Sequence, residues 1–206
     1  MDTVRIAALL QPFLGDRTLS DAQLSHLSGY LDLLLKWNEK TNLTAVRQAE
    51  EIVPRHFGES LFVAKELVTA ETHTAADVGS GAGFPGLPLA ISAPDARVTL
   101  IESNNKKATF LKEIIRVAGI SNTSVFAGRA ESSKDSFDLV TLRAVEKFET
   151  SAVVAASLVV PQGRLALLIG AAQVKIAAEL LPDIHWADPH PIPRSESRVL
   201  FVGRKP

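Results

Sequence analysis

Apolar positions follow two different periodicities along the 206-residue chain. Within residues 1–70 they recur at the three- and four-residue spacing of an amphipathic helix. The apolar positions of the first strongly periodic run are Leu24, Leu27, Leu31, Leu34 and Leu35. Ser20 and Gln23 precede this run at the spacing of a capping box, so we expect the helix to begin there.

A later helix in the same region is expected to carry Pro54 in its first turn, where a missing N–H does no harm. Phe57, Leu61 and Phe62 would then lie on its buried face. Residues 1–70 contain no convincing strand pattern, so they are predicted to form an N-terminal helical region.

From about residue 74, short β-type runs alternate with helical segments. The predicted strands are residues 74–78, 97–102, 123–127, 137–142, 164–169 and 198–202. The predicted helices between them are residues 85–92, 106–118, 150–159 and 172–181. This alternation is typical of an α/β fold, a mostly parallel sheet with helices on both faces, and residues 71–206 are predicted to form that domain.

Composition and charge exclude several classes of protein. Lys and Arg number 22 against 23 Asp and Glu, so no surface-wide field for polyanions is present, although a local basic patch is compatible with this balance. Cysteine is absent, which excludes disulfides, cysteine-ligated metals and a cysteine nucleophile. Asp2 does not suit a secretory signal, and the apolar run 152–160 is too short to span a bilayer. We therefore expect a cytoplasmic protein without a membrane segment.

The first predicted strand runs into a glycine-rich turn, DVGSGAGFPG at residues 77–86. Gly79, Gly81 and Gly83 allow a sharp turn and leave no Cβ between the backbone and a ligand. Pro85 suits the start of the following helix, whose free N–H groups are expected to favour a polar or anionic group. The turn therefore predicts a ligand site at the carboxyl end of this strand.

Two acidic residues bear on which ligand binds there. Glu102 ends the second predicted strand, where it could hold the hydroxyls of a ribose. Because Gly81, Gly83 and Gly86 also satisfy the dinucleotide fingerprint, NAD is an alternative. The Asp77 carboxylate favours a ligand ammonium and disfavours a diphosphate. S-adenosyl-L-methionine (AdoMet) carries an ammonium and no phosphate, and the spacing from Asp77 to Gly83 resembles the first motif of AdoMet methyltransferases.

Residues after the third and fourth predicted strands complete the expected site. Ala130 and Glu131 are placed to form a side wall for an adenine. Arg143 follows the fourth strand and is the candidate catalytic residue, positioning donor or substrate through its planar guanidinium.

The residues after the fourth strand also restrict which kinds of atom could accept the methyl group. The motif that orients exocyclic amines, an Asn, Asp or Ser followed by two prolines and an aromatic residue, is absent after the fourth strand. Carbon-5 methylation of pyrimidines in the common way needs a cysteine, which the chain lacks. A ring nitrogen with a free lone pair, such as guanine N7, needs no base, so in-line positioning would suffice.

Seven segments together resemble one known family. They are WNEKTNLT at residues 37–44, RHFGESL at 55–61, DVGSGAGFPG at 77–86, ESNNKK at 102–107, FL at 110–111, RAE at 129–131, and the strand 137–142 with Arg143. The chain is identified by them as similar to the RsmG (GidB) methyltransferases, which modify guanine N7 in small-subunit (16S) ribosomal RNA.

The resemblance implies a Rossmann-like methyltransferase fold and specific roles for individual residues. AdoMet contacts are implied at Gly79, Phe84, Ala130, Glu131 and Arg143, with the ribose held by Glu102. Substrate contacts are implied at Asn42, Arg55, His56 and Arg198. We expect a metal-independent monomer that acts on ribosomal RNA within a ribosomal particle.

Glu59 stands where Asp is usual in the second of the seven segments. Two further departures, Ile169 where Lys is usual and Ser197 where an acid is usual before Arg198, weaken the resemblance for RNA binding and leave the expected cofactor site untouched. The alternatives to ribosomal RNA methylation are an AdoMet enzyme acting on a small molecule, a non-catalytic ribosome-binding protein and an NAD-dependent oxidoreductase.

Overall fold

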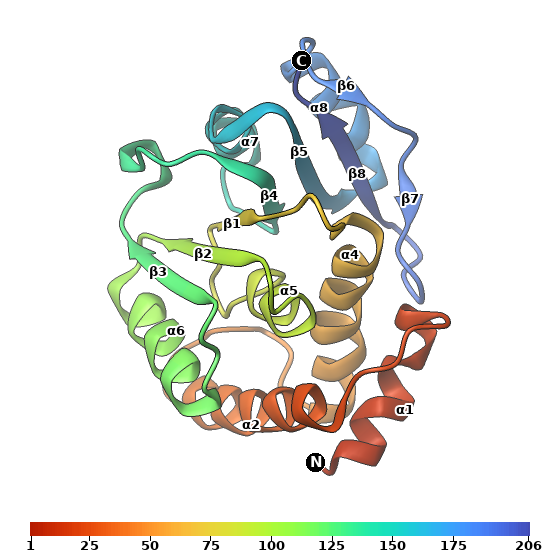
Figure 1. The fold of residues 1–206 in the computed structure, drawn as a ribbon, viewed down its shortest axis with the longest axis vertical. Coiled ribbons are helices and arrows are strands. Elements are labelled where there is room, and N and C mark those ends of the chain that lie inside the picture. Colours follow the sequence, from red (N-terminus) through yellow and green to blue (C-terminus); the bar gives the residue numbers. More distant parts are fainter.

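A computed structural model describes residues 1–206 and contains an eight-stranded sheet (Figure 1). Its strand order is β3-β2-β1-β4-β5-β8-β6, with β7 also paired to β8. The strands are β1 Thr74–Val78, β2 Arg97–Glu102, β3 Thr123–Ala127, β4 Phe137–Arg143, β5 Val159–Gly170, β6 His185–Trp186, β7 His190–Pro191 and β8 Arg198–Arg204. The first five are parallel and the last three antiparallel to their neighbours, so the expected mixed α/β sheet is confirmed.

The order of the strands reverses between β1 and β4, and their register aligns the loops that follow them. Val78 at the end of β1 pairs with Ile101 of β2 and with Leu142 of β4. Gly79, which follows β1, and Glu102 and Arg143, the last residues of β2 and β4, therefore lie side by side at the same edge of the sheet. Ligands of open α/β sheets bind at such a reversal, beyond the carboxyl ends of the strands.

Helices lie on both faces of the sheet (Figure 1). They are α1 Thr3–Leu14, α2 Asp21–Asn38, α3 Ala49–Ile52, α4 Glu59–Leu67, α5 Gly86–Ser92, α6 Asn105–Ala118, α7 Phe148–Ser157 and α8 Val174–Leu180, with a π-helical segment at Val53–Gly58 and single 3₁₀ turns at Ala130–Ser132 and Ala171–Gln173. The N-terminal helices pack on the side of α5 and α6 (Figure 1). The predicted capping box is present, because Ser20 and Gln23 exchange both hydrogen bonds.

Two apolar clusters fill the two faces of the sheet. The larger has 36 buried residues and joins α1, α2 and α4 to α5, α6 and one face of the strands. The smaller has 18 buried residues and packs α7 and α8 against the other face. The N-terminal helices thus share their core with the helices of the α/β layer, although the sequence pattern divides the chain near residue 70.

Several predicted boundaries are wrong. Pro54 lies in the first turn of the π-helical segment Val53–Gly58, but this segment does not start a helix, because it continues the one that begins at Ala49 and runs on into α4. A π-helical turn changes the hydrogen-bond spacing, which accommodates a proline that has no N–H to donate. Val159 was predicted in a helix but begins β5, since α7 ends at Ser157. Helix α1 and the short strands β6 and β7 were not predicted.

No helix combines the length and hydropathy needed to cross a bilayer.

Candidate active site

The glycine-rich turn after β1 is built over the end of β2. Gly79, Gly81 and Gly83 all have positive φ angles, of 68°, 57° and 96°. The N–H of Gly79 donates to the Ile101 carbonyl at 2.9 Å, and the N–H of Gly81 donates to Glu102 at 2.8 Å. Glycine adopts this left-handed backbone without strain, so the glycines are needed for the shape of the turn itself.

The glycines of the turn differ in what surrounds them. A Cβ on Gly83 would lie 2.5 Å from a Leu87 methyl group, and one on Gly86 would lie 2.7 Å from the Cβ of Asp77. A Cβ on Gly81 would meet nothing closer than the Gly79 carbonyl at 3.8 Å. Gly83 and Gly86 therefore permit close packing, whereas Gly81 leaves open space that a ligand can use.

Asp77, near the end of β1, links the glycine turn to α5 and β4 through its carboxylate. Its side chain is buried, with one carboxylate oxygen accepting from the Thr141 hydroxyl at 2.8 Å and the other from the Gly86 N–H at 3.1 Å. Burial raises the pKa of this carboxyl to about 6, against the opposing effect of those hydrogen bonds. The expectation of free N–H groups at the start of α5 is wrong, because Asp77 takes the first and the Gly83 carbonyl takes that of Leu87.

Glu102 connects the turn to the loop after β2. One carboxylate oxygen accepts from the Gly81 N–H at 2.8 Å and the other from the Asn104 N–H at 2.7 Å, while the side chain stays only 7% exposed. An ionised carboxylate offers about four acceptor positions, so it retains capacity for two ribose hydroxyls. Its position at the end of the second strand is the one that sequence reasoning predicted.

Arg143 reaches from the end of β4 to the N-terminal helices. Its Nη2 donates to the Arg55 carbonyl at 2.9 Å, to His56 Nδ1 at 3.2 Å and to Glu59 at 2.9 Å. Its Nη1 is the one buried side-chain polar atom of the protein that has no hydrogen-bond partner. A buried unpaired donor costs about 1–3 kcal/mol, so an acceptor on a bound ligand would relieve this cost.

His56 lies between Arg143 and the loop that precedes α3. Burial, followed by the charges of Arg143, Arg55 and Arg198, lowers the pKa of His56 to about 3, so the ring is neutral near pH 7. Since the arginine can only donate, His56 Nδ1 must accept, and Nε2 carries the proton that it shares with Thr44 at 2.8 Å.

The remaining predicted residues occupy different places around this centre. Phe84 is buried and stacks on the ring of His56 at 4.9 Å between centroids. Ala130 is buried in the 3₁₀ turn after β3, and the side chain of Glu131 beside it is exposed. Asn42 and Arg55 are exposed, and the Asn42 carbonyl oxygen accepts from Arg47. The binding roles assigned to all these residues stay predictions.

Sequence reasoning missed two residues that organise the site. Glu59 is 2% exposed and its carboxylate joins Arg143 to Arg198. Tyr30 is fully buried, and its hydroxyl donates to the Ala82 carbonyl of the glycine turn. The signal for Glu59 was a carboxylate inside an apolar helix face, because buried acids need a partner. No comparable local signal marks Tyr30.

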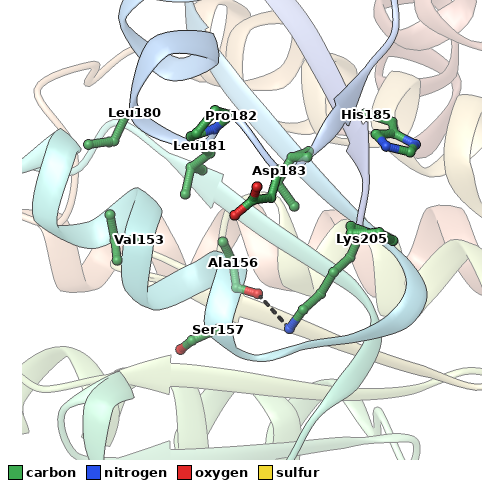
Figure 2. Close-up of a pocket in the computed structure, with 11 residues that line it drawn as sticks. Val153, Ala156, Ser157, Leu180, Leu181, Pro182, Asp183, His185 and Lys205 are labelled. Carbon is green, nitrogen blue, oxygen red and sulfur yellow. Dashed lines mark hydrogen bonds between the residues drawn. The ribbon is translucent and has the colours of Figure 1, made fainter.

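A cavity of about 690 Å³ lies elsewhere, between the end of α7, the segment after α8 and the C-terminal residues, where Lys205 donates to the Ala156 carbonyl at 3.4 Å (Figure 2). None of the predicted site residues lines it. Nowhere in residues 1–206 do three or more His, Cys, Asp or Glu side chains gather to hold a metal ion.

Comparison with known proteins identifies the family. A family model described as GidB, rRNA small subunit methyltransferase G, matches residues 23–182. The chain belongs to this family. Relatives named Ribosomal RNA small subunit methyltransferase G include one from Halorhodospira halophila, 41% identical over 82% of this chain and 81% of the relative. One from Xanthomonas euvesicatoria is 37% identical over 97% of this chain and 95% of the relative.

Solved structures support the fold. A SAM dependent methyltransferase from Aquifex aeolicus matches with a TM-score of 0.61 over 84% of this chain and 96% of its own, at 14% identity. Precorrin-6y C5,15-methyltransferase from Geobacter metallireducens matches with a TM-score of 0.56 over 71% of this chain and 88% of its own, also at 14% identity. The chain is thus a methyltransferase of the GidB family with the Rossmann-like fold that the sequence predicted.

The site fits the cofactor class that this fold implies. AdoMet needs a close backbone approach, an acceptor pair for its ribose and a donor for its carboxylate. The open side of Gly81, the residual acceptor capacity of Glu102 and the unpaired Nη1 of Arg143 meet these three requirements.

Proposed function

We propose that this methyltransferase uses AdoMet to methylate N7 of a specific guanine in 16S ribosomal RNA. The observation that carries the proposal is the meeting of Gly79, Glu102 and Arg143 at register-matched strand ends in a chain of this family. The names of its relatives support the RNA substrate, and the chemistry of the site supports the ring nitrogen.

Cofactor binding is assigned to the residues around the glycine turn. Gly81 would admit AdoMet against the backbone, Gly79 would contribute through its backbone at the start of the turn, and Glu102 would accept hydrogen bonds from the ribose. Phe84, Ala130 and Glu131 would shape its surroundings, while Arg143 would donate from Nη1. When bound, AdoMet supplies a methyl group activated by a sulfonium. The side chains around the site would orient the guanine N7 toward that methyl group.

Methylation at guanine N7 requires no proton transfer before the step, because N7 carries a lone pair and no proton at neutral pH. The side chains near Arg143 suit such a base-free reaction. Both ring nitrogens of His56 are already engaged, with Thr44 and with Arg143, and its pKa of about 3 leaves it little strength as a base. The protein's contribution would be in-line positioning of the nucleophile.

Exposed residues around the site are assigned to the RNA. Arg55 and Asn42 lie on the surface of the N-terminal segments, and Arg198 is 32% exposed at the start of β8. The formal net charge of −1 limits non-specific attraction to phosphates. We therefore propose that a monomer recognises a folded ribosomal particle in the cytoplasm in preference to naked RNA.

Deleting the gene and probing small-subunit ribosomal RNA by borohydride and aniline cleavage tests the proposed reaction. We expect one N7-methylguanine to disappear, to return with the wild-type gene and to stay absent with Glu102→Ala. Glu149→Ala, at an exposed position of α7, is the matched control and should restore methylation. An unchanged methylation pattern after deletion would refute the proposal.

The substrate form is tested by measuring binding to naked 16S RNA and to small-subunit particles at equal salt. We expect tighter binding and faster methylation with particles, and equal affinity for both would contradict a particle substrate. Methylation of a small molecule without RNA would support the alternative class of AdoMet enzyme. Calorimetric titration with NADH and AdoMet side by side tests the oxidoreductase alternative.

A further inference from the structure

Glu59 places a buried carboxylate between two arginines from distant parts of the chain. It is the first residue of α4, whereas Arg143 ends β4 and Arg198 begins β8. One carboxylate oxygen accepts from Arg143 Nη2 at 2.9 Å. The other accepts from Arg198 Nε at 3.1 Å and from its Nη2. With 2% exposure, the carboxylate has little contact with water.

The contacts of Arg143 show that its orientation is set by a single short segment. Its Nη2 is held by the Arg55 carbonyl, His56 Nδ1 and Glu59, which all lie between residues 55 and 59. A guanidinium is planar, so fixing one terminal nitrogen restricts where the other can point. Among these three acceptors only Glu59 carries a charge, and charged acceptors form the stronger hydrogen bonds.

We propose that Glu59 is a positioning residue for methyl transfer, whose charge orients the Arg143 guanidinium so that its unpaired Nη1 is held ready for an acceptor on the bound cofactor. Arg198 supports this arrangement from β8, because it occupies the carboxylate oxygen that Arg143 leaves free. The inference rests on the proposed function, since AdoMet binding is its readout.

Two substitutions separate the charge of Glu59 from its volume. Glu59→Gln keeps the size of the side chain and removes its charge, whereas Glu59→Asp keeps the charge and removes one methylene. AdoMet dissociation constants are measured by calorimetry in the absence of RNA. We expect Glu59→Gln to weaken AdoMet binding at least 10-fold and Glu59→Asp to weaken it less than about 3-fold. A packing role for Glu59 predicts the reverse order, because the smaller side chain leaves a cavity.

Steady-state kinetics provide a second readout that a merely structural role would not change. For Glu59→Gln we expect the KM for AdoMet to rise with little change in the KM for the RNA particle. Loss of folded protein would instead lower kcat at unchanged KM. The matched control is Glu50→Gln, which breaks another Glu–Arg pair, the half-exposed one with Arg5, and should leave both constants unchanged.

The outcomes distinguish this inference from the proposed function. If wild-type protein fails to bind AdoMet, the proposed function itself is wrong. If it binds AdoMet and Glu59→Gln binds equally well, only the positioning role is overturned. Should Glu59→Gln fail to fold by circular dichroism, Glu59→Asp decides alone, and a loss of affinity beyond about 3-fold would overturn the role of the charge.

Discussion

His56 is a neutral, partly buried histidine in an environment of arginines. Its ring accepts from Arg143, donates to Thr44 and stacks on Phe84, so it connects the N-terminal segments to the glycine turn. A pKa of about 3 in the folded protein compares with 6.5 for a free histidine. The folded state therefore resists a protonation that the unfolded chain accepts.

Replacing His56 with Gln should make the protein less sensitive to acid. For a base whose pKa falls on folding, the stabilisation is fully present above pH 6.5 and is lost as the pH falls toward 3. Between pH 6.5 and 4.5 we expect the wild type to lose roughly 2 kcal/mol more unfolding free energy than His56→Gln. Urea denaturation at each pH measures this difference.

Asp77 has the opposite effect on the unfolding free energy, because its pKa is raised on folding, so its contribution increases as the pH falls below 6. Its pKa is raised to about 6, so its contribution is fully present below pH 3.8 and is lost as the pH rises through 6. Because Asp77 is present in both proteins, its contribution cancels in the comparison. If the unfolding free energies of wild type and His56→Gln changed with pH in parallel, the pKa of His56 would not be lowered in the folded protein.

Helix α2 shapes the glycine turn at the scale of whole elements. Tyr30 points from the middle of α2 to the Ala82 carbonyl, and its ring stacks on Phe84 at 5.3 Å between centroids. A Cβ on Gly83 would lie 2.7 Å from the tyrosine hydroxyl. The conformation of the turn thus depends on a helix about 50 residues earlier in the chain.

Tyr30→Phe should weaken AdoMet binding by altering the glycine turn. The phenylalanine keeps the ring packing but leaves the Ala82 carbonyl without its donor, which costs about 1–3 kcal/mol. We expect a several-fold higher dissociation constant for AdoMet, measured by calorimetry. Ser28→Ala removes another α2 hydroxyl that donates to a carbonyl, that of Met1, and should not change AdoMet affinity. Equal effects of both variants would contradict this role of Tyr30.

Two alanine substitutions in the turn should have different effects. Gly81→Ala meets open space, so it should cost about 1 kcal/mol for its positive φ angle and should obstruct AdoMet. Gly86→Ala would collide with Leu100 and Asp77 and should destabilise the fold more strongly. We expect Gly81→Ala to lower AdoMet affinity at least 10-fold with a small change in Tm, and Gly86→Ala to lower Tm most. The reverse ranking would show that the open side of the turn is not a ligand site.

At the scale of the molecule, the sheet separates two apolar clusters of unequal size. The larger joins α1, α2 and α4 to α5 and α6, so the N-terminal region covers apolar surface of the α/β layer. A domain that folds alone needs a core of its own. Because the larger cluster includes residues from both sides of the predicted division near residue 70, we expect the two regions to depend on each other for folding.

Removing residues 1–70 should therefore prevent cooperative folding of the rest. The truncated chain would expose the face of α5 and α6 that α2 covers, together with Arg143, which loses Arg55, His56 and Glu59 as partners. We expect no sharp thermal transition by calorimetry, with the full chain as control. A cooperative transition in the truncated chain would establish residues 71–206 as an independent domain.

Local patterns in the chain were enough to predict the alternation of strands and helices, the glycine turn and the family. These features depend on local patterns, namely the period of apolar positions and the spacing of glycines, which short segments contain in full. All six strands expected from the pattern are present. The errors are the unpredicted α1, β6 and β7 and boundaries such as those at Val159 and Pro54, where local preference gives way to strand pairing and helix continuation.

Which charged and polar groups meet depends on the three-dimensional arrangement of strands and helices. Glu59 finds Arg143 and Arg198 at sequence separations of 84 and 139 residues, and Tyr30 reaches Ala82 across 52. Any of the 22 Lys and Arg residues could in principle balance a buried carboxylate, and a local pattern carries no information about which one does. That choice follows from the order of strands in the sheet and from the helices packed against it.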